Sequence, residues 1–137
     1  MKFSFSLLML ALVVSCGSKP VTEEPDVEEL LGVWECSDFP SGFLDKVGLA
    51  KPIPISRVVI REDGSCSAEN FPQRSPYRFE DLPASNWSLV DPSRTPSGAW
   101  SVEIAGHYLQ CRRKGDELRL RCLISGMDEY AVTYRRK

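Results

Sequence analysis

The sequence of 137 residues contains a single histidine, His107, and no G-x-S-x-G motif or comparable serine or cysteine pattern accompanies it. Without a nucleophile for this histidine to activate, the residues do not predict a hydrolase. The chain also lacks a glycine-rich phosphate loop and a helix-borne pair of metal ligands. Three carboxylate pairs lie where turns are expected and where acids are ordinarily solvated: Glu62-Asp63, Asp116-Glu117 and Asp128-Glu129. We therefore expect a protein that is not an enzyme and that needs neither a cofactor nor a metal.

A long apolar run and a large charge of one sign are missing as well. The apolar stretch at residues 3–14 has twelve residues and contains Ser4 and Ser6, whereas a membrane-spanning helix needs about 20. The formal net charge is −2, and residues 31–137 hold 14 acidic and 15 basic residues. This balance does not predict a nucleic-acid partner.

The N-terminus has the organisation of a secretory signal. Met1 and Lys2 give a positive start, the apolar run follows, and Gly17 and Pro20 oppose continuation of a helix. The run ends in Val13-Val14-Ser15-Cys16. In order, these are an aliphatic residue, a position that accepts many residue types, a small residue and a cysteine. These four residues resemble the lipobox of bacterial lipoprotein signal peptides.

The resemblance implies that residues 1–15 are a lipoprotein signal peptide and are removed. Cys16 then becomes the N-terminus and carries a thioether-linked diacylglycerol, usually with an amide-linked third chain such as palmitate. Two or more chains hold a protein firmly on a bilayer, since each buried methylene contributes about 0.8 kcal/mol. In Gram-negative lipoproteins, an aspartate directly after the lipidated cysteine favours retention in the inner membrane. This chain has Gly17 at that position, so the resemblance implies the outer membrane of a Gram-negative envelope, with the protein facing the periplasm.

Residues 16–30 have a composition unlike that of a folded core. Five acidic residues against Lys19 give the segment a net charge of about −4, and it offers little to bury before Leu30. We therefore expect a flexible acidic tether. The remaining residues, 31–137, have the length of one domain, and we expect that domain to be a monomer.

Two glycine–tryptophan motifs stand far apart in this domain. Residues 31–36 read L-G-V-W-E-C, and alternation along a strand places Trp34 and Cys36 on the same, inner side. Residues 98–100 repeat the motif as G-A-W.

The clearest hairpin lies between these motifs, over residues 55–70. Apolar residues alternate along it, and Asp63-Gly64 supplies the turn. Together with the two G-x-W motifs, this hairpin resembles those of lipocalins and of bacterial lipocalin-like lipoproteins. The resemblance implies a small antiparallel β-barrel with Trp34 and Trp100 in its interior. Cys66 departs from it, because an aromatic core residue usually occupies that position.

The other segments predict a meander with two long connections. Ser41 is expected to cap a short helix that ends near Gly48. Residues 71–96 contain five prolines and are expected to form a long loop over one end of the barrel. From Gly98 onwards, alternation and glycine turns predict consecutive strands, the last of them carrying Tyr130, Val132 and Tyr134 on one face. The fold is predicted to be all-β, a lipocalin-like barrel or strongly curved meander of about seven strands with one or two short helical turns.

The turn at Gly115-Asp116 allows the register of one hairpin to be predicted. It places Cys111 opposite Leu120 and Arg112 opposite Arg119, with Arg121 diagonal on the outer face. Like charges directly opposite each other destabilise a sheet. We therefore expect the positive charge of Arg112, Arg119 and Arg121 to be offset by a nearby anion. Candidates are Glu103 or Glu129 on a neighbouring strand, or an acidic partner such as a lipid phosphate or a protein carboxylate.

Four cysteines remain after Cys16 is assigned to lipid, and none forms a C-x-x-C pair. An even number in an oxidising envelope favours two disulfides. Cys122 is diagonal to Cys111 at about 7–8 Å, which twist or a bulge must shorten. Of the three connectivities that sequence leaves open, we favour Cys36–Cys66 and Cys111–Cys122.

Two classes of function remain. The first is a non-catalytic binding module for a small apolar ligand or an envelope component, with the ligand at the barrel mouth under residues 37–55 and 71–96. The second is an inhibitor or immunity-type lipoprotein that neutralises a periplasmic enzyme. In the second class the loop aromatics would be exposed anchors, namely Phe39, Phe43, Tyr77 and Phe79. Buried aromatics beside an open cavity favour the first class, and a filled barrel with exposed aromatics favours the second.

Overall fold

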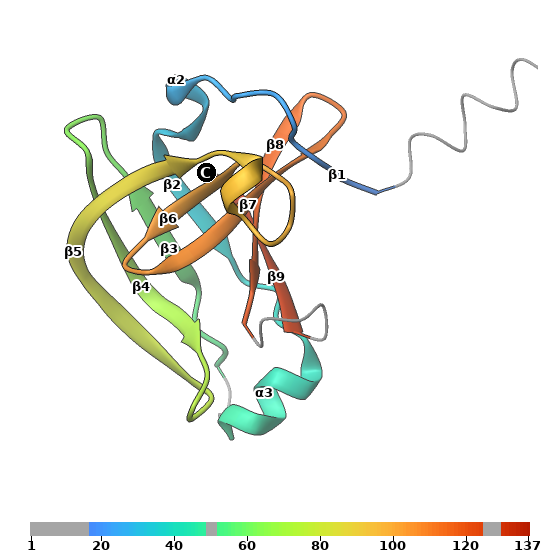
Figure 1. Cartoon of the computed structure of the whole chain (residues 1–137). Helices are drawn as coiled ribbons and strands as arrows, with labels where there is room; N and C mark the ends of the chain where they lie inside the picture. Colours follow the sequence, from blue (N-terminus) through green and yellow to red (C-terminus); the bar gives the residue numbers. More distant parts are fainter. Residues whose placement is uncertain (1–16, 49–51, 125–129) are drawn as a thin grey trace, which may run out of the picture.

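The computed structural model describes residues 17–48, 52–124 and 130–137. The predicted signal peptide, Cys16 and the predicted turn at residues 125–128 lie outside the described residues. Over the described ranges, strands follow one another along the chain and are interrupted by two short α-helices and one 3₁₀ turn (Figure 1).

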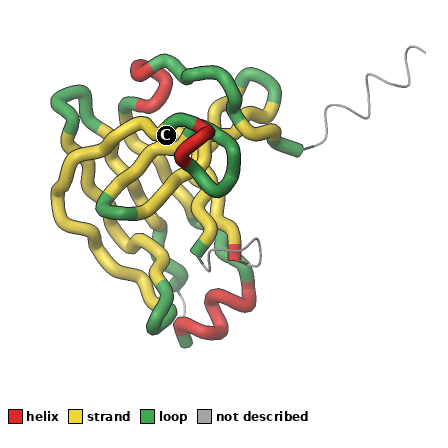
Figure 2. Tube along the Cα trace, in the orientation of Figure 1, coloured by secondary structure: helices red, strands yellow, loops and turns green. Residues whose placement is uncertain are grey.

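The strands close into a barrel of simple up-and-down topology. Each strand from β2 to β9 is antiparallel to the next, and β9 returns to pair with β2, which gives a closed eight-stranded barrel (Figure 2). This confirms the predicted all-β fold. About seven strands were expected, and the described residues form eight barrel strands and the short β1. The strands are β1 (Lys19–Pro20), β2 (Gly32–Cys36), β3 (Ser56–Ile60), β4 (Ser65–Gln73), β5 (Arg78–Val90), β6 (Ser101–Ile104), β7 (His107–Lys114), β8 (Glu117–Leu123) and β9 (Ala131–Arg136). The helices are α2 (Val27–Leu30), α3 (Ser41–Val47) and the 3₁₀ turn η1 (Pro92–Arg94).

Alternation along the strands fills the barrel interior. Trp34 and Cys36 are both buried, as predicted, and Trp34 is fully enclosed. The indole Nε1 of Trp34 donates a hydrogen bond of 2.9 Å to the carbonyl of Leu30, which ties β2 to α2 at the barrel floor. Gly32, at φ +123°, turns the chain into the barrel in a conformation that favours glycine. Trp100 differs from the prediction: it is only partly buried and lies against the core's edge, with its indole bonded to the carbonyl of Thr22.

The β7–β8 hairpin has the predicted register. Cys111 pairs with Leu120 and Arg112 pairs with Arg119. Inward-facing residues of β8 are buried, whereas the arginines between them are partly exposed. A two-residue turn fixes the pairing of the strands that it joins, and the buried face then fixes which side chains point outward.

Residues 71–96 do not form the predicted loop. Most of them belong to a long hairpin of β4 and β5, whose paired residues include Pro72 and Phe79. The prolines are tolerated for local reasons. Pro72 lies beyond the part of β4 that pairs with β3. Pro83 lies in a bulge, where two residues stand between Leu82 and Ser85 but only one stands between their partners on β4.

An aromatic cluster closes the end of the barrel that carries α3. Phe43 of α3 is fully buried, with ring centroids 5.4 Å from Phe79, 6.0 Å from Tyr77 and 6.4 Å from Tyr130. The helix ends at Gly48 as predicted, in the left-handed conformation at φ +69°. Ser41, predicted as the cap, is instead the first helical residue, and Pro40 occupies the cap position.

The acidic N-terminal segment is packed on the barrel. Val21 is buried, its amide donates to the carbonyl of Cys111 at 3.0 Å, and its carbonyl accepts from the amide of Trp100 at 2.9 Å. Glu29 forms two hydrogen bonds with Arg113, at 2.9 and 3.0 Å, and this contact lowers the pKa of the Glu29 carboxyl. The prediction of a flexible tether is therefore wrong for the described residues from Ser18 to Leu30.

Candidate functional site

A pocket opens where β7 and β8 separate. Toward the α3 end of the barrel, their ladder stops at the pair Gln110–Arg121. A pocket of about 470 Å³ begins there. Its lining includes two side chains that face the barrel interior, His107 and Cys122. It also includes Tyr108 and Gln110, which lie on the opposite face of β7. The pocket therefore reaches both faces of the wall at this gap.

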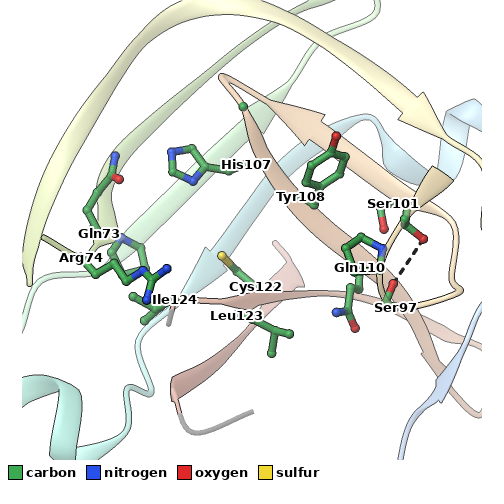
Figure 3. A pocket seen from close by; sticks show the side chains of 14 residues that line it. Gln73, Arg74, Ser97, Ser101, His107, Tyr108, Gln110, Cys122, Leu123 and Ile124 are labelled. Carbon is green, nitrogen blue, oxygen red and sulfur yellow. Dashed lines mark hydrogen bonds between the residues drawn. The ribbon is translucent and has the colours of Figure 1, made fainter. Parts of the chain in front are cut away.

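The other walls of the pocket come from distant parts of the chain. Gln73 and Arg74 approach from the end of β4, and Ser97 approaches from the loop before β6. Figure 3 shows Gln73, His107 and Cys122 projecting from three strands toward one space, with Ser97 and Gln110 on the other side of Cys122 in this view. Pro72, Leu123 and Ile124 add apolar surface.

His107 lies half-buried at the inner side of the pocket. Its ring centroid is 4.8 Å from that of Phe71. Burial lowers the pKa of the imidazole, and the nearby carboxylate of Glu80 opposes that effect. His107 is therefore neutral at pH 7 and presents one nitrogen donor and one nitrogen acceptor.

Several polar side chains at the pocket are not satisfied by the protein. Within the described ranges, the side chains of Gln73, Arg74, His107 and Gln110 form no hydrogen bond or ion pair. Gln110 is 8% exposed. The polar atoms of its amide still reach solvent, because the buried side-chain atom without a partner among the described residues is Arg119 Nε. The pocket thus combines apolar walls with two amides, a neutral imidazole and a guanidinium at its rim, which is the composition of ligand-binding pockets.

Cys122 is held in the pocket wall as a neutral thiol. Burial raises the pKa of the Cys122 thiol to about 12, so the thiol is not ionised at neutral pH and is a poor nucleophile. Among the described residues, the imidazole of His107 forms no hydrogen bond with a thiol or hydroxyl group. A nucleophile paired with a base is therefore not assembled at this pocket.

The structure corrects the predicted disulfides. Cys36, Cys66, Cys111 and Cys122 are four buried free thiols. Cys36 pairs with Ser56 of β3, whereas Cys66 pairs with Ile60, so they are separated by four residues along β3, or about 13 Å. Cys111 and Cys122 are diagonal, as predicted, but the register does not bring them closer.

Thiol titration tests this correction. We expect native protein at pH 7.5 to react hardly at all with Ellman's reagent, because the thiols are buried and burial raises the pKa of both Cys111 and Cys122 to about 12. In guanidinium chloride without reductant, four thiols should react if Cys16 is in thioether linkage. Five would show that Cys16 is unmodified, and none before reduction would show that disulfides form.

The predicted arginines lie on the outer wall. The side chains of Arg112, Arg119 and Arg121 alternate with buried residues of β7 and β8, and Lys114 and Arg135 extend the group on both sides. We call the outward residues Arg112, Lys114, Arg119, Arg121 and Arg135 the arginine face.

The protein itself offsets part of this charge. Arg112 donates to the hydroxyl and carbonyl oxygens of Ser18 at 2.8 and 2.7 Å. Glu117 accepts from Arg119 at 3.4 Å and from Arg135 at 3.0 and 3.3 Å. Glu117, which the sequence placed in a solvated turn pair with Asp116, thus takes the role that was expected of Glu103 or Glu129. Glu129 lies outside the described residues. The Nε atom of Arg119 is buried without a hydrogen-bond partner.

The loop aromatics are not exposed anchors. Phe39 and Phe43 are buried, and Tyr77 and Phe79 are half-buried in the same cluster. The part of the chain that the structure describes contains no helix long and apolar enough to cross a membrane. It also brings no three potential metal-ligating side chains together.

Most of the pocket was not visible in the sequence. His107 was considered only as a catalytic base, and Gln73, Arg74, Tyr108 and Gln110 were not singled out. They come from β7 and from the end of β4, which are more than 30 residues apart, and their spacing along the chain has no motif. Comparison with protein-family models, curated proteins and solved structures finds no match to this chain. The geometry of the barrel is therefore what supports a functional proposal.

Proposed function

We propose that the protein is a non-catalytic binding module, anchored in the bacterial envelope by lipids on Cys16, that holds a small ligand in the pocket between β7 and β8. The pocket carries this proposal. Its volume of about 470 Å³ lies within the range of small-molecule sites, roughly 300 to 1,000 Å³. The lipobox resemblance supports the anchor and the envelope location, with the outer membrane as the proposed site and the domain facing the periplasm.

The lining indicates a largely apolar ligand with one hydrogen-bonding group. Leu123 and Ile124 offer aliphatic contacts, while Gln73 and His107 offer donors and acceptors with no partner among the described residues. Binding satisfies these groups only if the ligand is polar where it meets them. A purely apolar molecule would leave them desolvated and unpaired.

The alternative, an inhibitor or immunity-type protein, has weaker support. Such interfaces are centred on exposed aromatic or arginine anchors. Phe39 and Phe43 instead stabilise the α3 end of the barrel. Among the described residues, Tyr108, which is 43% exposed, is the one aromatic of the large exposed apolar residues, and it belongs to the pocket.

Blocking the pocket tests the proposal. Ser97 is an exposed loop residue at the pocket, and Ser88 is an exposed residue of β5 outside it. We expect Ser97→Trp to occupy the pocket and Ser88→Trp to leave it open. The three proteins are extracted from membranes in mild detergent, and their bound small molecules are released and measured by mass spectrometry.

We expect a compound that is retained by the wild type and by Ser88→Trp. Its amount on Ser97→Trp should be at least tenfold lower, which corresponds to about 1.4 kcal/mol of lost affinity. If every retained compound is equally abundant on both variants, the pocket is not a ligand site.

A further inference from the structure

We propose that the arginine face lies against acidic lipid headgroups, so that the barrel rests on the membrane surface. This inference rests on the proposed anchoring at Cys16, but it concerns a different surface from the pocket. The partner is an anionic bilayer, which supplies a dense plane of phosphates.

The first observation is the charge of the face. Arg112 and Lys114 point outward from β7, Arg119 and Arg121 from β8, and Arg135 from β9. Glu117 is the acidic residue among the described outward positions of these three strands. The described outward positions of this wall are therefore rich in basic side chains, although the net charge of the whole chain is −2.

The second observation is how closely the charges are stacked. Arg112 pairs with Arg119, and Arg119 pairs with Arg135, so three arginines stand side by side across three strands. Like charges directly opposite each other destabilise a sheet. The single carboxylate of Glu117 serves two of them, and the Nε atom of Arg119 has no partner. Guanidinium groups bind phosphate oxygens well, so lipid headgroups would offset this repulsion.

The third observation is where the anchor leaves the barrel. Ser18 is held by Arg112 of the arginine face, and β1 pairs with β7 directly after it. Only Gly17 separates Ser18 from Cys16, and two residues reach about 7 Å at most. Lipids on Cys16 would therefore hold the bilayer beside Arg112. Figure 1 shows β1 leaving the barrel near the start of β8, far from α3.

The N-terminal segment contacts this face through Ser18, and its acidic residue Glu29 lies elsewhere. Its helix α2 lies over the barrel floor (Figure 1), where Glu29 binds Arg113 and the carbonyl of Glu29 accepts from Arg136. The pocket begins at Gln110, where the β7–β8 ladder ends. Variants at Lys114 and Arg135 therefore change the face without changing the pocket lining.

The test measures binding of the purified full-length protein to vesicles by co-sedimentation. The vesicles are phosphatidylcholine alone or phosphatidylcholine with phosphatidylglycerol at about 30%. The face variant is Lys114→Gln with Arg135→Gln. The control is Lys46→Gln with Arg61→Gln, which removes two exposed charges from α3 and from the β3–β4 turn.

We expect phosphatidylglycerol to strengthen binding of the wild type and salt to reduce that gain. Each basic residue at an anionic surface contributes about fivefold, so the face variant should lose about 25-fold on acidic vesicles and the control less than twofold. On phosphatidylcholine alone, all three proteins should bind equally through the anchor.

Two results would overturn the inference. One is that the wild type binds equally to both kinds of vesicle. If the wild type then binds polyglutamate in solution and the face variant does not, the face serves an acidic protein instead. The other is an equal loss in both variants. If lipidation is absent, binding to phosphatidylcholine fails while the gain from phosphatidylglycerol remains, so the two proposals fail separately.

Discussion

Replacing Trp34 with alanine is expected to lower the free energy of unfolding by about 4 kcal/mol. The side chain has no exposed surface, and its indole bonds to the carbonyl of Leu30 at 2.9 Å. Truncation leaves a large cavity at the barrel floor and a buried carbonyl without its donor. For a chain of this length the midpoint of thermal unfolding should fall by roughly 15 °C.

Trp87→Ala is the matched control. Trp87 also donates from its indole to a backbone carbonyl, that of Arg61 at 2.9 Å, but it is only partly buried at the edge of the core. We expect it to cost about 1 kcal/mol, because one hydrogen bond and part of a contact are lost. Circular dichroism during urea unfolding measures both variants. Equal losses would show that Trp34 does not hold the floor.

The β7–β8 hairpin shows what sequence can fix. Gly115 and Asp116 mark a short turn, and alternation of Leu118, Leu120 and Cys122 marks the buried side. Turn and alternation together leave a single register, because a slip by one residue would turn every apolar side chain outward. The opposed pair Arg112–Arg119 followed from that register alone. The part of the arginine face on β7 and β8 that holds Arg112, Arg119 and Arg121 was therefore predictable, whereas Arg135 joins it only through the pairing of β8 with β9.

The β4–β5 hairpin shows where composition misleads. Five prolines in residues 71–96 suggested a loop, because proline cannot donate to a sheet. Pro72 and Pro83 occupy positions where the ladder does not need their amides, at an overhang and at a bulge. The lengths and pairing of the neighbouring strands decide which positions tolerate proline. That information does not lie in residues 71–96 themselves.

The N-terminal segment was misjudged for a related reason. Its average composition is acidic and poor in apolar residues, but Val21 and Leu30 are buried and Glu29 meets Arg113. Their partners lie many residues further along the chain, beside β7 and under the barrel floor. The pocket was missed in the same way, since its polar groups come from β4, β7 and the loop before β6. Register within a hairpin is local, whereas these contacts depend on closure of the barrel.

Cys16→Ser is expected to have the largest effect on location. The lipobox resemblance makes Cys16 the attachment point of at least two acyl chains, and loss of the chains removes about 0.8 kcal/mol per buried methylene. Affinity for phosphatidylcholine membranes should fall by several orders of magnitude. Salt-washed membranes should retain the wild type and release the variant, and the intact mass of the variant should lack the acyl increment.

Ser15→Ala is the control, because it keeps a small residue before the cysteine and should leave lipidation intact. A wild-type mass without acyl chains, or a Cys16→Ser variant that resists the salt wash, would contradict the anchor. The docked position of Ser18 adds a further expectation. The proposed anchor would hold the arginine face at the bilayer, so removing it would also lower the effective concentration of the face there. On acidic membranes, Cys16→Ser should therefore leave weak binding that salt abolishes, and adding Lys114→Gln with Arg135→Gln should remove most of that remainder.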